Sequence, residues 1–173
     1  MLFGVKEKVS LAEYSSFEIG GPARYFFVAK NKQDLLNAVK YVKKENIPYL
    51  VIGEGTNILF PDEGYEGMVI KIETDTPKTE GEKVISGAGT SLISVVNFSL
   101  KNSLSGLEWA VGIPGSLGGA VYGNAQAFGQ KMSDTVESVE ALNKDSLEFQ
   151  ILRNKECLFE NKSSIFKKEK NLI

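Results

Sequence analysis

Histidine is absent from the 173 residues of this sequence, and its absence excludes several kinds of catalysis at once. There can be no Ser-His-Asp or Cys-His arrangement, no zinc centre of the HExxH type, and no cofactor tethered through an imidazole. Any redox chemistry would therefore be carried by a cofactor that is held non-covalently. No metal site is predicted.

Cysteine, long apolar runs and basic stretches are also scarce. Cys157 is the one cysteine, so no disulfide can form within the chain, and without a histidine to activate its thiol we expect a structural role. No apolar run approaches roughly 18 residues and no signal peptide follows Met1, so we expect a cytoplasmic protein without a membrane partner. The net charge is −2 and no lysine-rich stretch is interleaved with aromatic residues, so no nucleic-acid partner is expected.

The remaining composition is that of a folded protein, with 42% hydrophobic and 24% charged residues. A chain of this length forms one large domain or two small lobes, and it can bury roughly 70% of the surface that its unfolded form exposes. A polar stretch from Thr74 to Glu82 separates two halves in which strand-like and helical patterns alternate. We therefore expect two lobes, residues 1–76 and residues 77–173.

The first lobe is expected to be α/β. Apolar residues repeat at helical spacing between Asn31, which fits an N-cap, and the segment Asn46–Pro48, which ends the pattern. Strands are expected around this helix, over Arg24–Ala29, Tyr49–Ile52, Ile58–Phe60 and Met68–Ile72.

In the second lobe, a short strand over Val84–Ser86 precedes an amphipathic helix over Ser91–Asn102. The apolar face of this helix is expected to consist of Leu92, Val95, Val96, Ser99 and Leu100. Further along, Val139–Leu142 and Leu147–Ile151 are expected to form a hairpin, because turn-forming residues separate them.

Three glycine clusters are candidates for a ligand site. The first, Gly53–Asn57, follows an expected strand, where glycines allow positive φ and a close approach of the backbone to a ligand. Successive N–H groups in such a turn form an anion-binding concavity, to which Thr56 and Asn57 add side-chain donors. The alternative is a tight turn without a ligand. No Gly-Lys-Ser/Thr follows, which excludes a P-loop.

The second cluster, Gly87–Gly89, lacks the third glycine of a dinucleotide-binding fingerprint, because Leu92 occupies that position. A helix-entry turn that also contacts a ligand is the preferred interpretation. The third cluster extends from Gly112 to Gly129, and Pro114 is predicted as the first residue of a helix. The small residues after it would leave free N–H groups for a diphosphate, unless the glycines serve close helix packing instead. Together the clusters indicate one extended, phosphate-containing ligand, which is either a dinucleotide or a nucleotide sugar.

An ordered series of motifs covers nearly the whole chain: Ser16–Arg24, Val51–Phe60, Gly87–Gly89, Gly106–Glu108, Gly112–Gly119, Asn124 and Ala127–Gly129. In this order they resemble the UDP-N-acetylenolpyruvoylglucosamine reductase family of bacterial peptidoglycan synthesis. The resemblance implies an α+β FAD-binding fold of the vanillyl-alcohol-oxidase (PCMH-type) class, in which two α+β lobes hold FAD between them.

The resemblance also implies which residues contact the cofactor. In the first lobe these are Gly53, Glu54, Gly55, Thr56, Asn57, Ile58 and Leu59; in the second they are Gly89, Ile113, Pro114, Gly115, Ser116, Gly118, Gly119, Ala120, Asn124 and Gly129. In the family, NADPH reduces the flavin, and the flavin passes a hydride to the enolpyruvyl group of UDP-N-acetylglucosamine enolpyruvate. A serine of the protein donates the proton that completes the reduction.

Two departures from the family pattern are visible. Asn161–Lys167 corresponds to a Tyr-Arg-x-Ser-x-Phe-Lys element, so Lys162 stands at the position of a catalytic arginine and lacks its planar fork. The chain ends at Ile173, where the family continues into a third domain with the proton-donating serine, a glutamate and the substrate site. We therefore expect negligible turnover, nucleotide-sugar binding only when that domain is supplied, and self-association through the surface that it would cover.

Two other interpretations stay open at this point. The residues Asn161 and Lys162 are also compatible with a stand-alone flavin-binding or regulatory protein of the same fold. A small flavin oxidase of the same superfamily is less favoured, because covalent tethering there commonly uses a histidine. For Arg24, Glu54 and Glu108, a ligand contact and a structural ion pair are equally compatible with the sequence.

Overall fold

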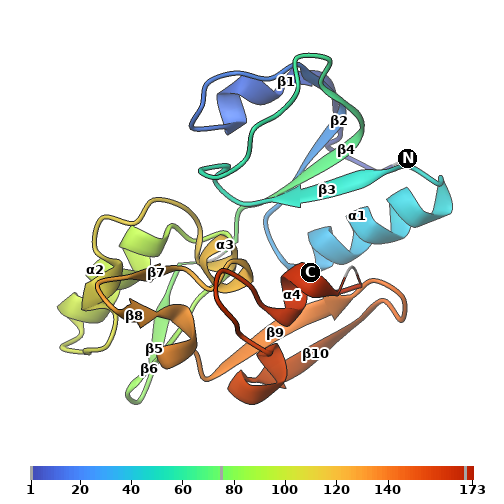
Figure 1. The fold of residues 1–173 in the computed structure, drawn as a ribbon. Coiled ribbons are helices and arrows are strands. Elements are labelled where there is room, and N and C mark those ends of the chain that lie inside the picture. The colour runs from blue at the N-terminus through green and yellow to red at the C-terminus, as the bar shows by residue number, and fades with distance from the viewer. Residues whose placement is uncertain (1, 75, 170) are drawn as a thin grey trace. The chain divides into compact units, whose positions relative to one another are not determined.

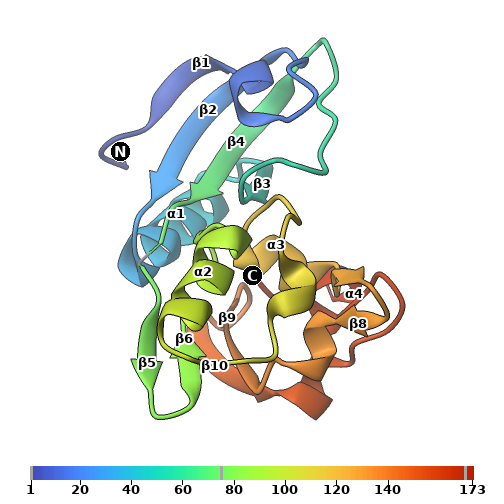
Figure 2. The same ribbon diagram turned by 90° about the vertical axis from the view of Figure 1, so that its left-hand side faces the viewer.

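The computed structural model describes residues 2–74, 76–169 and 171–173. The chain divides into two compact units, Met1–Asp75 and Thr76–Ile173, and this boundary lies one residue from the expected one. Figure 1 and Figure 2 show the helices and strands of both units from two directions. Each unit mixes helices with strands, and no helix within the described ranges is long and apolar enough to span a membrane.

The first unit is built on a four-stranded sheet with the strand order β1-β2-β4-β3 (Figure 1). Its strands are β1 (Lys6–Ser10), β2 (Pro22–Ala29), β3 (Tyr49–Ile52) and β4 (Tyr65–Ile72). β1 is antiparallel to β2, whereas β4 is parallel to both β2 and β3. Three of the expected strands are therefore present. β1 was not predicted, because its mostly exposed residues carry little apolar pattern.

Helix α1, Lys32–Lys44, begins and ends where the sequence predicts. The Asn31 side chain caps its N-terminus by accepting a hydrogen bond from the Asp34 N–H at 2.9 Å. Ala38, Val39 and Val42 form the buried face of the helix. The chain turns away two residues after Lys44, at Asn46, which has a φ of +54° and is exposed to solvent.

Alternating side chains of the sheet divide the core of the first unit into two layers. One layer combines residues of the sheet with the buried face of α1: Phe27, Ala29, Met68, Ile70 and Ile72 with Ala38 and Val42. The other layer lies on the opposite face of the sheet and is covered by a 3-10 turn, Leu11–Tyr14, and by Phe60: Leu11, Ala23, Phe26, Ile52, Phe60 and Val69. The first glycine cluster belongs to the loop that covers this second layer.

The second unit combines three hairpins with short helices. The hairpins are β5–β6 (Lys78–Glu80, Lys83–Ile85), β7–β8 (Gln126–Ala127, Gln130–Lys131) and β9–β10 (Ser138–Asn143, Glu148–Arg153). The helices are α2 (Leu92–Lys101), α3 (Leu117–Tyr122) and α4 (Ile165–Lys168), with 3-10 turns at Glu108–Ala110, Met132–Asp134 and Asn154–Cys157. The expected helix and the expected hairpin after residue 138 are both present.

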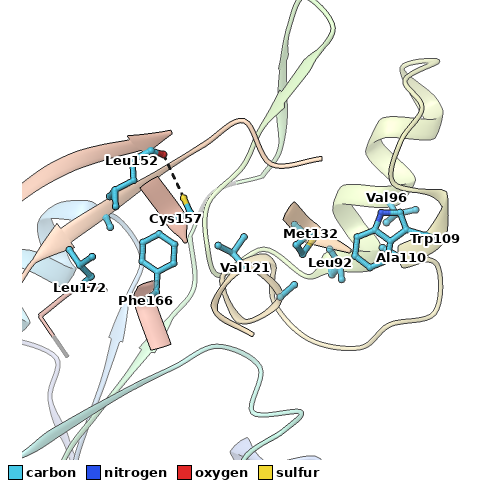
Figure 3. Packing of buried hydrophobic residues seen from close by; sticks show 12 residues of the cluster. Leu92, Val96, Trp109, Ala110, Val121, Met132, Leu152, Cys157, Phe166 and Leu172 are labelled. Carbon is cyan, nitrogen blue, oxygen red and sulfur yellow. Dashed lines mark hydrogen bonds between the residues drawn. The ribbon is translucent and has the colours of Figure 1, made fainter. Parts of the chain in front are cut away.

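One hydrophobic core holds the second unit together, and Figure 3 shows Trp109, Met132 and Val121 among its members. Cys157 is fully buried in it, and its thiol lies 3.8 Å from the Leu152 carbonyl. The buried face of α2 differs from the expected one at a single position. Leu92, Val95, Val96 and Ser99 are buried, but Leu100 is 53% exposed because it lies toward the solvent side at the end of the helix.

Candidate functional site

The loop that follows β3 carries the first glycine cluster. The prediction of a strand at Ile58–Phe60 is wrong, because these residues belong to a loop and pair with no strand. Phe60 is 4% exposed and packs in the core layer opposite α1, whereas Leu59 is 63% exposed. The apolar triplet therefore contributes a core side chain without the backbone pairing of a strand.

Two hydrogen bonds hold this loop against the residues that follow the Leu11–Tyr14 turn. The Ser15 hydroxyl donates to the Ile58 carbonyl at 2.7 Å, and the Ser16 N–H donates to the Gly55 carbonyl at 3.3 Å. Gly55 has a φ of +69°, and a Cβ at this position would lie 1.8 Å from the Tyr14 carbonyl oxygen. Only glycine fits here. Ser15 was not singled out from the sequence, although it directly precedes the Ser16–Arg24 motif.

The backbone donors of this loop are free to bind a ligand. Within the described ranges, none of the N–H groups from Gly53 to Asn57 donates a hydrogen bond. The side chains of Thr56 and Asn57 also have no hydrogen-bond partner in the described part of the chain. Unpaired N–H groups that follow one another in a glycine turn bind anions, and a diphosphate is such an anion. The loop is therefore a candidate site for a diphosphate.

In the second unit, the second and third glycine clusters lie side by side. A two-residue bridge joins Ser91 to Ser116. Three backbone hydrogen bonds of 2.8 Å accompany it, from Leu92 N–H to Gly115, from Leu117 N–H to Thr90 and from Gly118 N–H to Ala88. A Cβ at Gly118 would lie 2.8 Å from the Cβ of Ala88. Gly118 thus allows two segments of the chain to pack closely, which was the alternative interpretation of these glycines.

This arrangement contradicts the prediction of free N–H groups on a helix that begins at Pro114. Helix α3 begins at Leu117, and its N-cap Ser116 accepts a hydrogen bond from the Gly119 N–H at 3.2 Å. Gly115 has a φ of +117°, which lies outside the helical region, so the helix cannot begin before it. Since the chain itself occupies the N–H groups of Leu117, Gly118 and Gly119, the start of α3 is not a diphosphate site.

The residues just before α3 keep their donors. The N–H groups of Gly112, Gly115 and Ser116 donate no hydrogen bond to any described residue, whereas the Ile113 N–H donates to the Ala110 carbonyl at 3.1 Å. The bridge between Ser91 and Ser116 is of the type in which both residues turn their own N–H groups away from the partner segment. Gly115 and Ser116 therefore present two adjacent N–H groups, and an oxygen of a ligand can accept hydrogen bonds from them.

Some of the other residues singled out from the sequence have a structural role in the second unit. Gly129 has a φ of +81° and forms the turn between β7 and β8 together with Phe128, whose φ is +51° and whose side chain is 90% exposed. Ala120 is 8% exposed and belongs to the hydrophobic core. Glu108 accepts a hydrogen bond from the Gly106 N–H at 2.7 Å, so its carboxylate supports a turn.

Asn124 and Lys162 lie in neighbouring segments of the second unit. Asn124 is 1% exposed, and its side-chain amide donates to the Glu160 carbonyl at 2.9 Å. Lys162 follows shortly after Glu160 in an exposed loop, and its ammonium group forms no ion pair with a described residue. The Lys162 carbonyl accepts a hydrogen bond from Nζ of Lys167 at 3.1 Å. Asn124 therefore contacts the segment that carries Lys162, at Glu160.

Comparison with protein families connects this chain to flavoproteins. The family described as an FAD binding domain matches residues 23–148. UDP-N-acetylenolpyruvoylglucosamine reductases of Caldanaerobacter subterraneus and Solibacter usitatus are 38% and 36% identical over 94% and 98% of this chain. The chain covers 54% of each of these two proteins, so it spans about half the length of the curated relatives that it matches.

Solved structures give the same result for the fold. The UDP-N-acetylenolpyruvylglucosamine reductase of Thermus caldophilus is 32% identical, with a TM-score of 0.77 over 91% of this chain and 56% of that chain. p-Cresol methylhydroxylase, at 12% identity, has a TM-score of 0.63 over 90% of this chain and 35% of that chain, which is a likeness of fold alone. The predicted α+β fold of the vanillyl-alcohol-oxidase (PCMH-type) class is confirmed.

Proposed function

Because this chain belongs to the FAD binding domain family and resembles the FAD-binding half of UDP-N-acetylenolpyruvoylglucosamine reductases, we propose that it is the FAD-binding part of such a reductase. FAD is its cofactor. The reaction assigned is the reduction of the enolpyruvyl group of a UDP-linked sugar for peptidoglycan synthesis, with NADPH as the electron donor. A cytoplasmic location and an effect on cell wall formation, cell shape and cell division belong to the same proposal.

The observation that carries this proposal is the run of unpaired N–H groups from Gly53 to Asn57. They are assigned to the diphosphate of FAD, together with the side-chain donors of Thr56 and Asn57. In the second unit, the N–H groups of Gly115 and Ser116 are assigned as donors to FAD, with Ile113 and Pro114 as neighbouring contacts. When bound, FAD supplies the hydride chemistry that no side chain of this histidine-free sequence can provide.

Lys162 is assigned a part in catalysis because it stands at the family's arginine position. Its ammonium group has no ion-pair partner among the described residues, so its charge is available to the substrate. A single ammonium group stabilises the negative charge that develops on a substrate oxygen during reduction, but it cannot bind two oxygens in one plane as a guanidinium does. Replacing Lys162 by arginine is therefore expected to raise turnover once the rest of the substrate site is supplied.

A titration of the purified chain with FAD and with riboflavin, followed by flavin fluorescence, tests the cofactor assignment. Riboflavin lacks the diphosphate, so we expect it to bind at least about tenfold more weakly than FAD. The double variant Thr56→Val, Asn57→Ala should weaken FAD binding by about tenfold and leave riboflavin binding unchanged. Asn97→Ala, which removes an exposed amide on α2, is the matched control. Equal binding of FAD and riboflavin would contradict the diphosphate assignment, and absence of FAD binding would contradict the whole proposal.

A stand-alone flavin-binding or regulatory protein is the second candidate, and the lysine at position 162 is the observation that favours it. NADPH oxidation in the presence of the enolpyruvyl nucleotide sugar separates the two candidates. The chain alone should show negligible turnover under either one. Addition of the remaining half of a related reductase should restore turnover if the chain is part of a reductase. Continued inactivity of the reconstituted mixture, including the Lys162→Arg variant, would favour the stand-alone protein.

A further inference from the structure

Asn124 follows the end of helix α3 and has both ends of its amide engaged inside the second unit. Its Nδ2 donates to the Glu160 carbonyl at 2.9 Å, and its Oδ1 accepts from the Ser133 N–H at 3.0 Å. The residue is 1% exposed, and its φ of +43° is one that asparagine tolerates better than most residues. An amide that is buried and bonded in this way is turned toward the protein and is not presented to a ligand.

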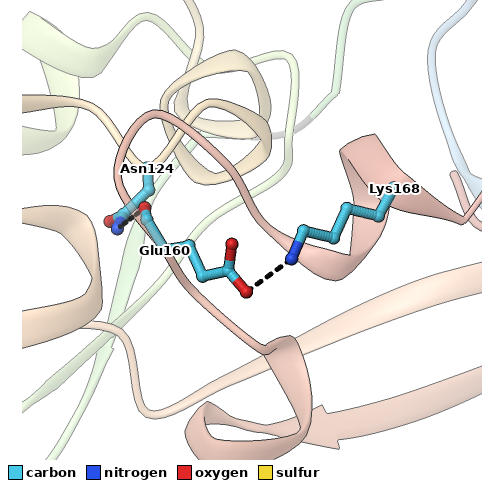
Figure 4. A network of polar contacts seen from close by, with 3 residues as sticks. All are labelled: Asn124, Glu160 and Lys168. Atoms are coloured by element: carbon cyan, nitrogen blue, oxygen red, sulfur yellow. Dashed lines mark hydrogen bonds and ion pairs between the residues drawn. The ribbon is translucent and has the colours of Figure 1, made fainter.

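The contact to Glu160 fixes one side of the segment that carries Lys162. The Glu160 N–H donates to the Ser163 carbonyl at 2.9 Å, so the backbone closes into a tight turn around Lys162. The Glu160 carboxylate forms an ion pair with Lys168 at 2.5 Å, and Figure 4 shows Glu160 between Asn124 and Lys168. Glu160 is thus held from two directions by residues that lie far apart in the sequence.

A second anchor lies on the other side of Lys162. The Ser164 side chain is fully buried, and its hydroxyl donates to the carbonyl of Tyr122, the last residue of α3, at 2.8 Å. Lys162 itself has a φ of +53°, which costs free energy in a lysine and persists only when the surroundings impose it. Asn124 and Ser164 anchor the chain on the two sides of Lys162, next to the turn that the backbone groups of Glu160 and Ser163 close.

We infer that Asn124 is a positioning residue, which holds the Lys162 segment at the end of α3, and that it is not a ligand of FAD. The inference deepens the proposed function and rests on it for the part that Lys162 plays beside the flavin. It also reassigns Asn124, because the family resemblance placed this residue among the cofactor contacts.

Hydrogen exchange on the cofactor-free chain tests the positioning contact directly. Asn124→Gly removes the side chain while glycine keeps the positive φ, and Asn46→Gly is a matched control at an exposed position with a φ of +54°. We expect the backbone amides of Glu160, Ser163, Lys167 and Lys168 to exchange about tenfold faster in Asn124→Gly only. Unchanged exchange would overturn the inference. If Asn124→Gly does not fold, Asn124→Asp keeps the acceptor for Ser133 and places a carboxylate oxygen where the donor to Glu160 was, and the same amides should exchange faster in it.

The flavin-loaded chain provides a readout that a merely structural role would not change. Asn124→Gly should bind FAD within about twofold of the unchanged chain, whereas loss of a cofactor ligand would weaken binding by about tenfold. The proposed place of Lys162 beside the flavin predicts that Lys162→Met lowers the reduction potential of the flavin, because a positive charge is removed. Asn124→Gly should shift it in the same direction, and the double variant should show no further shift. Additive shifts would contradict positioning through Lys162. A chain that binds no FAD would refute the proposed function, and the exchange measurement would still decide the part of Asn124.

Discussion

The glycine loop of the first unit and the start of α3 in the second unit use their backbone groups in opposite ways. In the first unit, the loop around Gly55 accepts hydrogen bonds through its carbonyls and leaves its N–H groups unpaired. In the second unit, the first N–H groups of α3 donate to the Ala88–Thr90 segment and to Ser116. Glycine therefore marks places where something approaches the backbone closely. The hydrogen bonds show whether a ligand or the chain itself can do so.

The largest effect is expected from Gly55→Ala, which tests the loop of the first unit. The new Cβ would lie 1.8 Å from the Tyr14 carbonyl oxygen, and the φ of +69° would be strained as well. We expect the free energy of unfolding to fall by about 3 kcal/mol or more, and FAD binding to be lost. Urea unfolding followed by circular dichroism, together with the FAD titration, measures both.

Gly81→Ala separates strain from the close approach. Gly81 has a φ of +61° in the β5–β6 turn, but a Cβ there would meet nothing within 4 Å. Gly81→Ala should therefore lower the free energy of unfolding only by the strain of a left-handed backbone, about 1–2 kcal/mol. Equal losses for the two variants would mean that the contact with Tyr14 does not fix the loop.

The second comparison is within α3, between Gly118→Ala and Gly119→Ala. A Cβ at Gly118 would lie 2.8 Å from Ala88, whereas at Gly119 the nearest atom is the Ser116 hydroxyl at 3.2 Å. We expect Gly118→Ala to lower the free energy of unfolding by about 1–3 kcal/mol. Gly119→Ala should be close to neutral, because alanine favours the helix by about 1 kcal/mol. Trp109, the one tryptophan, reports the unfolding of the second unit.

The same pair of variants also tests whether the two loops differ in ligand binding. If Gly118→Ala and Gly119→Ala both weakened FAD binding and left stability unchanged, the start of α3 would be a ligand site. The two loops would then work in the same way, and the assignment of the diphosphate to Gly53–Asn57 would have to be shared.

Local signals in the sequence predicted the regular elements well. Helix α1 was located by the Asn31 cap and the apolar repeat after it, and the β9–β10 hairpin by alternation around a turn. Ile58–Phe60 was mistaken for a strand, because a buried aromatic residue in a loop gives the same apolar signal as a strand residue. Pro114 was mistaken for a helix start, because the positive φ of Gly115 and the cap at Ser116 compete with that rule.

The candidate site was less predictable than the elements. The sequence located the glycines, but the availability of an N–H group depends on segments that are distant along the chain. Ser15 supports the loop at Ile58, and Ala88 occupies the N–H of Gly118. Asn124 bonds to Ser133 and Glu160, and the tertiary fold likewise determines these two partners. No periodicity or motif encodes such pairings, so the distinction between a ligand site and a packing site required the structure.

A further effect concerns pH, and it distinguishes the units through Cys157, which occurs only in the second unit. Burial, assisted by the Glu156 carboxylate, raises the pKa of the Cys157 thiol to about 11 from a usual 9.0. The folded state therefore favours the neutral thiol, so its contribution to stability is complete below pH 9.0 and is lost as the pH rises through about 11. Burial also raises the pKa of Tyr65 in the first unit, so stability of the whole chain is not a specific readout.

The measurement is therefore the free energy of unfolding of the second unit, followed by the fluorescence of Trp109. This free energy should decrease between pH 9.0 and about pH 11, and the decrease should be smaller in Cys157→Ala. An identical pH dependence in that variant would show that the thiol does not titrate in the folded core, and the alkaline sensitivity of the second unit would then come from its other groups.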